Sequence, residues 1–141
     1  MKISDHIDYL EATHTGSGLP NIPDIDTLKR MQYVANNLFE PIRVHFNCPI
    51  HINSFYRSIE VNHAIGGATN SQHTKGEAID IACPTISTKE IFDYVHNHLN
   101  FDQCIIEPSW VHISLKYDGN RKETLKAVKV NGKMTYQKYP I

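Results

Sequence analysis

The sequence of 141 residues predicts one α+β domain, in which helices flank a central, mainly antiparallel sheet and a β-hairpin forms the C-terminal part. Three observations lead to this fold class. Apolar residues at a helical spacing follow residue 23, and short segments of strand type come after them. Near the end, Asn131-Gly132 separates two further strand-like segments. The chain is long enough for a hydrophobic core of its own.

The longest predicted helix begins near Asp24. Apolar residues recur at the helical period as far as Ile42, and either Asp24 or Asp26 can cap the first turn. We expect Pro41 to kink or end this helix, because proline lacks the amide donor. The preceding residues, 1–23, form a polar lead-in whose glycines and prolines exclude a long helix.

The remaining predicted elements are short. Ser87 and Glu90 have the spacing of a capping box, so we expect a helix from there to about Leu99. Asn131-Gly132 is typical of a type I′ hairpin turn. The other expected elements are a strand at 50–53, a helix at 58–64, a loop at 68–76, a strand at 78–82, two strands at 101–106 and 110–115, and a hairpin of 124–130 with 133–139.

The composition is that of an ordinary globular protein. With 40% hydrophobic residues and a formal net charge of -1, neither a disordered chain nor a strongly nucleic-acid-binding surface is expected. Residues 116–141 nevertheless carry seven Lys or Arg against two acidic residues, a net +5 that leaves -6 for residues 1–115. This basic end can attract an anionic polymer such as a cell wall, although a solvated hairpin face is the simpler explanation.

The cysteines and the N-terminal residues bear on the compartment. Three cysteines, an odd number without a Cys-x-x-Cys pair, predict free, buried thiols in a reducing compartment. The first residues are polar, so we expect synthesis in the cytoplasm without a Sec-type signal. No segment approaches the roughly 18 apolar residues that a membrane span needs.

Two histidines and one aspartate form a candidate ligand set for zinc. Two imidazoles and one carboxylate leave the fourth tetrahedral position open, as in catalytic zinc sites. Strand alternation places Asp80 opposite the face of its isoleucine neighbours, and places His112 likewise opposite Val111 and Ile113. If these two strands pair, Asp80 and His112 converge, and the preceding loop can bring His73 to them. On spacing alone, a metal site and unrelated structural roles both stay open.

These residues carry a resemblance to a known family. The pattern Ser-x-His-x-x-Gly-x-Ala-x-Asp is met from Ser71 to Asp80, and a Trp-x-His pattern is met by Trp110 and His112. The segment that begins Ser54-Phe55-Tyr56-Arg57-Ser58 is similar to a Ser-Gly-Tyr-Arg-Ser segment of the same family. The chain thus resembles the zinc D-Ala-D-Ala carboxypeptidases, whose superfamily includes lysostaphin-like peptidases and the hedgehog domain.

The resemblance implies a division of the chain and a set of roles. It covers roughly residues 25–115, so we divide a single zinc peptidase domain, 1–141, into a lead-in (1–23), a family core (24–115) and a basic C-terminal hairpin (116–141). It implies a hedgehog/D,D-peptidase-like fold and one Zn²⁺ per chain, held by His73, Asp80 and His112. Arg57 would bind the substrate carboxylate or stabilise the oxyanion. Ser71 and Trp110 would also contact the substrate, and Ser71 would hold the ligand loop.

The general base departs from the family pattern. Many relatives place an acid three residues before the final histidine, where this chain has Ser109. Glu107 is our candidate base, because a turn at the following Pro108 could direct its carboxylate toward the metal. A surface residue at a strand end is the alternative interpretation of Glu107, and Asp102 and Glu77 are weaker substitutes as base.

The expected function follows from the resemblance. We expect zinc-dependent hydrolysis of an amide bond in the peptidoglycan stem peptide, at or near D-Ala, in cell-wall degradation or phage lysis. The chain would then be a monomer of phage or prophage origin that reaches the wall through a pore-forming partner, or as part of a phage particle. A host cytoplasmic enzyme acting on dipeptides is a second setting. A non-catalytic zinc-binding recognition module on the same scaffold is the alternative function.

Overall fold

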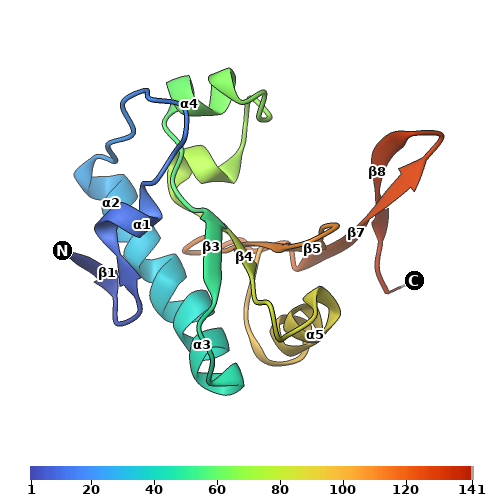
Figure 1. The fold of residues 1–141 in the computed structure, drawn as a ribbon. Helices are drawn as coiled ribbons and strands as arrows, with labels where there is room; N and C mark the ends of the chain where they lie inside the picture. Colours follow the sequence, from blue (N-terminus) through green and yellow to red (C-terminus); the bar gives the residue numbers. More distant parts are fainter. Residues whose placement is uncertain (141) are drawn as a thin grey trace.

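Six strands form one sheet in the computed structural model, which describes residues 1–140 (Figure 1). Neighbouring strands are antiparallel except β5 and β7, which run parallel. This confirms the predicted α+β fold with its mainly antiparallel sheet and C-terminal hairpin. In spatial order the strands are β3 (His51–Ser54), β4 (Ala78–Ala82), β6 (Val111–Ser114), β5 (Gln103–Ile106), β7 (Glu123–Val130) and β8 (Lys133–Lys138).

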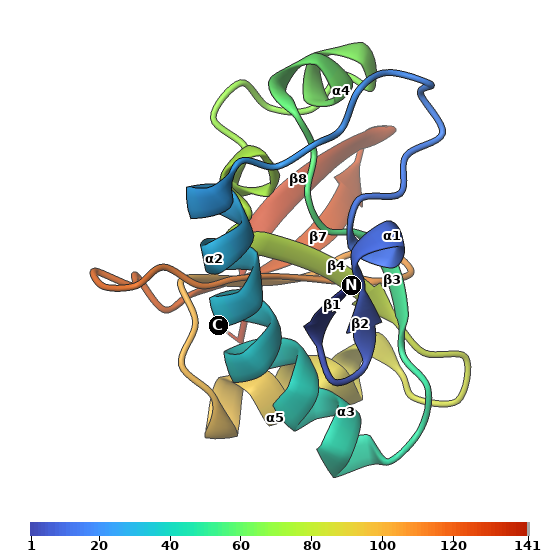
Figure 2. The ribbon, with the colours of Figure 1, turned by 90° about the vertical axis from the view of Figure 1, so that its left-hand side faces the viewer.

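The predicted long helix is longer than expected. It comprises α2 (Ile25–Val34), a π-helical turn (Ala35–Phe39) and α3 (Glu40–Phe46), which Figure 2 shows as one continuous run beside the sheet. The side chain of Asp24 caps it by accepting a hydrogen bond from the Thr27 amide. The expectation that Pro41 could end the helix is wrong, because the helix continues past this residue. The π-helical turn changes the hydrogen-bond spacing directly before Pro41, where a proline removes a donor, and the helix continues to Phe46.

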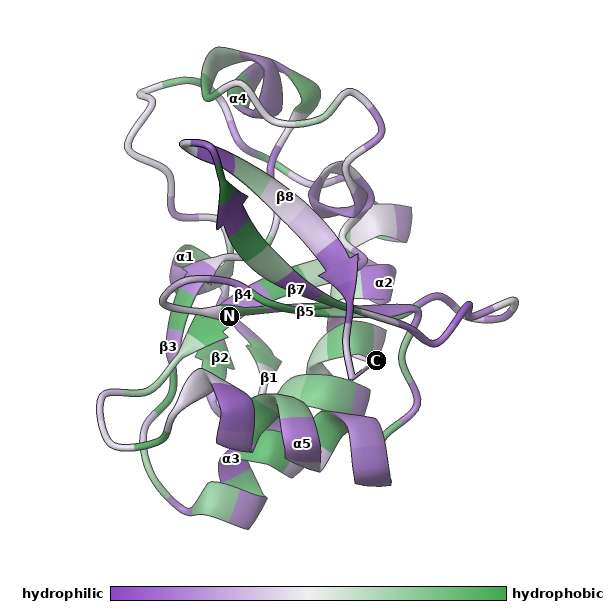
Figure 3. Ribbon diagram, turned by 90° about the vertical axis from the view of Figure 1, so that its right-hand side faces the viewer, coloured by the Kyte–Doolittle hydropathy of each residue, from purple (hydrophilic) through white to green (hydrophobic). Residues whose placement is uncertain are grey.

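The sheet separates the helical core from the polar side of the molecule. Figure 3 shows α3 and α5 (Thr88–His98) on one side of the sheet and α4 (Ile59–Ala64) on the other, and the β7–β8 hairpin bends from the edge of the sheet toward the side of α4. The apolar faces of β4 and β6 are buried in the core with the helices; these residues are Ile79, Ile81, Val111 and Ile113. The predicted capping box of Ser87 and Glu90 begins α5. Asn131 and Gly132 both adopt positive φ, as a type I′ turn requires.

The N-terminal residues contain small elements that the sequence pattern did not reveal. They are β1 (Lys2–Ser4), β2 (Ile7–Asp8) and α1 (Tyr9–Ala12), and each is only two to four residues long. Ile3, Ile7 and Ala12 are buried in the core, so this segment packs against the rest of the domain although its composition is largely polar. None of the helices described within residues 1–140 is long and apolar enough to cross a membrane.

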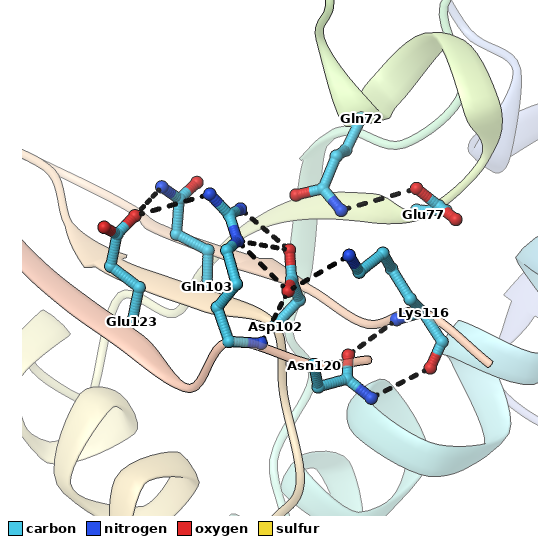
Figure 4. Close-up of polar contacts among 8 residues, drawn as sticks. Gln72, Glu77, Asp102, Gln103, Lys116, Asn120 and Glu123 are labelled. Carbon is cyan, nitrogen blue, oxygen red and sulfur yellow. Dashed lines mark hydrogen bonds and ion pairs between the residues drawn. The ribbon is translucent and has the colours of Figure 1, made fainter. Parts of the chain in front are cut away.

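A buried carboxylate connects the hairpin to the rest of the sheet. Asp102, directly before β5, is 1% exposed and receives three hydrogen bonds from the Arg121 side chain and one from the Arg121 amide (Figure 4). Its backbone carbonyl also accepts from the amide of Glu123, the first residue of β7. Although burial opposes ionisation, the hydrogen bonds from Arg121 lower the pKa of Asp102 below its ordinary value. This junction therefore fixes the point from which the hairpin leaves.

We predict that Arg121→Ala destabilises the fold by about 2 kcal/mol at neutral pH, because it leaves the buried Asp102 carboxylate short of charged donors. A lowered folded-state pKa stabilises above the unfolded value of 3.8 and loses that stabilisation as the pH falls through the folded-state value. The difference from wild type should therefore shrink in acid. Urea unfolding between neutral pH and pH of about 3 measures it. A difference that is independent of pH would contradict the ionic role of Asp102.

Candidate metal centre

Three segments bring two histidines and one aspartate together on the polar side of the sheet. His73 comes from a 3-10 turn (Gln72–Lys75), Asp80 from β4 and His112 from β6. One potential ligand atom from each lies within 4.8 Å of the others. Asp80 and His112 are direct partners in the antiparallel pairing of β4 with β6. The two strands therefore pair in the way that would bring these candidate ligands together.

The ring of His73 presents an unprotonated nitrogen to its neighbours. Its Nδ1 lies 2.8 Å from the carbonyl oxygen of Phe55, and because a carbonyl only accepts, Nδ1 carries the hydrogen. Burial lowers the pKa of His73, which favours the neutral ring. Its Nε2 is buried without a hydrogen-bond partner, yet it lies 3.2 Å from Asp80 Oδ2. Two electron-pair donors that face each other in a buried place suit a cation between them.

Asp80 supplies the negative charge of the cluster. Although burial opposes ionisation, the hydrogen bond with His112 and the nearby His73 ring hold the pKa of Asp80 well below its usual range. His112 Nδ1 lies 2.9 Å from Asp80 Oδ1. The donor set of two imidazole nitrogens and one carboxylate oxygen therefore fits a divalent ion such as zinc. These three residues could hold one metal ion.

The ligand loop is shaped by its own short-range contacts. Ser71 caps the 3-10 turn, because its hydroxyl accepts a hydrogen bond from the His73 amide at 3.2 Å. Gly76 ends the turn at a φ of +73°, and a Cβ there would lie 2.9 Å from the Thr27 carbonyl oxygen. Only glycine suits this conformation next to α2. The conformation of the loop thus depends on both residues of the sequence pattern.

Arg57 lies beside the cluster and is oriented by neutral partners. Its Nε donates to Ser54 Oγ at 3.1 Å and its Nη1 to Asn62 Oδ1 at 2.9 Å. Its Nη2 is 3.8 Å from Asp80 Oδ2. A side chain at Gly67 would overlap the Asn62 amide, so this glycine leaves room for the contact. Two N–H groups of the guanidinium are thus used for positioning, and the others are left for a ligand.

Residues outside the family pattern also hold the Arg57 segment. The buried Asn21 donates from Nδ2 to the carbonyl oxygen of Tyr56 at 3.0 Å and accepts at Oδ1 from the Ser58 amide at 2.6 Å. The Arg57 amide itself donates to the His73 carbonyl at 3.1 Å. The segment is thereby fixed on both sides to the N-terminal residues and to the ligand loop.

A cavity of about 460 Å³ opens over the cluster. Arg57, Ser71, Trp110 and Glu107 all line it together with the three candidate ligands, so every predicted site residue lies in one place. The structure also adds residues that sequence reasoning missed, because they come from β5 and from the segment after β6. These additional lining residues are Gln103, Arg121 and Tyr136.

Glu107 has the surroundings of a group that can exchange protons. Tyr136, from β8, donates its hydroxyl to the Glu107 carboxylate, with oxygen separations of 3.2 and 3.3 Å. Burial raises the pKa of Glu107, and the hydrogen bond from Tyr136 reduces that shift. Among the described residues that line the cavity, Asp80 and Glu107 are the only carboxylates.

The two weaker candidates for a base lie elsewhere. Asp102 is buried in its contact with Arg121 and does not line the cavity. Glu77 accepts a hydrogen bond from the side chain of Gln72 at 3.4 Å and is likewise not among the lining residues (Figure 4). Ser109, which stands where many relatives have an acid, is exposed. Glu107 thus remains the best-placed carboxylate for proton transfer.

The comparison with known proteins agrees with this geometry. A protein-family model described as Peptidase M15 matches residues 11–114, which include all three candidate ligands, Arg57 and Glu107. No curated protein matches the chain. A match over most of the chain, together with a cluster that could bind a metal, identifies the family. The chain belongs to the Peptidase M15 family, the metallopeptidase family of the zinc D-Ala-D-Ala carboxypeptidases.

Proposed function

We propose that this chain is a zinc-dependent peptidase that hydrolyses an amide bond in the peptidoglycan stem peptide, at or near D-Ala. The observation that carries the proposal is the unpartnered Nε2 of His73 facing the Asp80 carboxylate, in a cavity that also holds Glu107 and Arg57. Membership of the Peptidase M15 family supports the class of reaction. The choice of substrate rests on that family and on the cationic group in the cavity.

His73, Asp80 and His112 would hold the zinc. When bound, zinc polarises the scissile carbonyl and lowers the pKa of the attacking water. The protein prepares the ligand atoms in advance. The Phe55 carbonyl fixes the tautomer of His73, so that Nε2 is the free nitrogen, and the strand register fixes His112 next to Asp80.

Glu107 would act as the general base and then as the acid. Its carboxylate would take a proton from the attacking water and deliver it to the nitrogen of the leaving amine. Tyr136 would hold the carboxylate in place and shield it from solvent, since its hydroxyl bonds both oxygens. A raised pKa brings Glu107 closer to the pH at which it must both accept and release a proton.

Arg57 would bind the anionic part of the substrate. Its planar guanidinium matches a terminal carboxylate and can also stabilise a developing oxyanion. Since Ser54 and Asn62 already orient the group, little freedom is lost when the substrate binds. Ser71 and Trp110 would contact the remainder of the peptide from the cavity wall.

A phage or prophage lysis protein is the setting that we propose for this activity. The chain would act on the wall after release through a pore-forming partner, or as part of a phage particle, and it would act as a monomer. The lysines of the β7–β8 hairpin would add a weak attraction to an anionic wall.

A non-catalytic zinc-binding module is the second candidate function. The observation that favours it is Ser109, which replaces the acid that many relatives have three residues before the final histidine. Such a module would bind zinc and wall fragments without hydrolysing them. Turnover by the zinc-loaded protein distinguishes the two functions.

Zinc binding should depend on the three candidate ligands. Wild type should retain about one zinc per chain after dialysis, whereas His73→Ala and Asp80→Asn should bind it more than about 100-fold more weakly, because each removes one of only three protein ligands. Glu107→Gln is the control and should keep its zinc. Elemental analysis and competition with a chelator measure both. Zinc content that is the same in His73→Ala and wild type would refute the ligand assignment.

Hydrolysis should depend on Glu107 without any loss of metal. Glu107→Gln preserves the shape of the side chain but removes its basicity, so kcat should fall by about 10²- to 10⁴-fold. Release of peptide fragments from purified peptidoglycan, followed by mass spectrometry, measures the rate and identifies the bond. Undiminished hydrolysis by this variant would remove Glu107 as base.

Arg57→Lys should weaken the use of anionic substrates. A lysine keeps the charge but loses the forked geometry, so kcat/KM should fall by about 10- to 100-fold while zinc content stays at the wild-type level. Arg43→Lys, on α3 and not among the residues lining the cavity, is the matched control. An equal effect of the two substitutions would speak against a substrate-binding role for Arg57.

A further inference from the structure

Two cysteines lie side by side outside the cavity. Cys48 stands between α3 and β3, and Cys83 directly follows β4. Their sulfur atoms are 3.4 Å apart, and neither residue lines the cavity over the metal centre. The closeness follows from the register. His51 pairs with Ala82 in the antiparallel β3–β4 ladder, so the residues before β3 lie next to those after β4.

We infer that Cys48 and Cys83 are a disulfide-forming pair, which links the edge strand β3 covalently to β4 when the protein meets an oxidising environment. A disulfide has a sulfur separation of about 2.05 Å, so the two atoms need to approach by roughly 1.4 Å to form the bond. The expectation of buried thiols is wrong for Cys48 and Cys83, because both are partly exposed, so a small reagent can reach them. The three free thiols expected from the sequence then describe the reduced form of the protein.

The surroundings distinguish the two thiols. Burial opposes the ionisation of Cys83, but hydrogen bonds with Thr85, with Cys48 and with the Ile86 backbone outweigh it and lower the pKa of Cys83. The hydrogen bond with Cys83 raises the pKa of Cys48, and burial adds to this shift. The Cys83 sulfur is therefore the better nucleophile, because the thiolate is the reactive form.

The oxidant in this reaction is an external disulfide, such as oxidised glutathione or a thiol–disulfide oxidoreductase. The Cys83 thiolate attacks one sulfur of that disulfide, and the other sulfur leaves as a thiol. Cys48 then loses its proton and attacks the mixed disulfide at Cys83, which releases the second thiol. The protein loses two hydrogens, and the external disulfide is reduced to two thiols.

The position of the pair gives the bond a structural consequence. The bond closes a loop from residue 48 to residue 83, and this loop contains Arg57, His73 and Asp80. It also anchors β3, a four-residue strand at the edge of the sheet. Cross-linking restricts the unfolded chain, so the oxidised protein should be the more stable form. This inference does not depend on the proposed hydrolysis.

The third cysteine serves as an internal reference. Cys104 is fully buried in the core, and burial raises the pKa of its thiol well above the ordinary range. It should therefore remain reduced in the folded protein. Labelling after unfolding counts the thiols that remain, and Cys104 contributes one of them in either state.

The experiment exposes reduced, zinc-loaded wild type to oxidised glutathione, quenches it with acid, and alkylates it in denaturant before mass spectrometry. We expect one alkylated thiol, at Cys104, and a peptide pair that joins Cys48 to Cys83. Alkylation of all three cysteines, or glutathione that remains attached to Cys83, would overturn the inference.

Thermal unfolding of the same samples tests the consequence for stability. The midpoint should rise by about 5 to 15 °C on oxidation of wild type. Cys48→Ser and Cys83→Ser should show no such rise, because neither can form the bond. The comparison of oxidised with reduced wild type needs no variant, so it stays informative if a substitution impairs folding. A linked peptide pair without a higher midpoint would refute the stabilising role.

Discussion

The pairing of β4 with β6 is the constraint on which the candidate site depends. It sets Asp80 directly opposite His112 and turns Ile79, Ile81, Val111 and Ile113 toward the helices. Because side chains alternate along a strand, a shift of one residue would bury the ligands and expose the isoleucines. The free energy gained by burying the apolar face thus also holds the polar face in place. Core packing and the arrangement of the candidate ligands are two results of one register.

The third member of the cluster is held by polar contacts of the backbone. His73 is fixed by the Phe55 carbonyl at Nδ1 and by Ser71 at its amide, and the Arg57 amide bonds its carbonyl. The loop is therefore held in a position where the neutral imidazole of His73 and the Asp80 carboxylate direct electron pairs toward each other. A cation bound between them would relieve this repulsion. Arg57, at 3.8 Å, lies close enough to contribute positive charge but is held back by Ser54 and Asn62.

Much of this could be predicted from the sequence, because the relevant signals are local. The alternation around Asp80 and His112, the Asp24 cap, the Ser87 capping box and the Asn131-Gly132 turn each depend on a few neighbouring residues. Contacts between distant segments left no such signal. Tyr136 meets Glu107 only because the parallel pairing of β5 with β7 carries the last hairpin over the cavity. The π-helical turn before Pro41 and the small N-terminal strands depend in the same way on tertiary packing.

The walls of the cavity come from two different parts of the chain. The match to the Peptidase M15 family ends at residue 114, whereas Arg121 and Tyr136, which complete the cavity, come after it. The cavity is therefore built from two parts of the chain, the matched segment with the three candidate ligands and the segment that follows it. The Asp102 junction holds the hairpin at its base, and the three candidate ligands make no use of it. An exchange of this terminal hairpin would therefore change one wall of the cavity, including the contact of Tyr136 with Glu107, while the three candidate ligands stay in place.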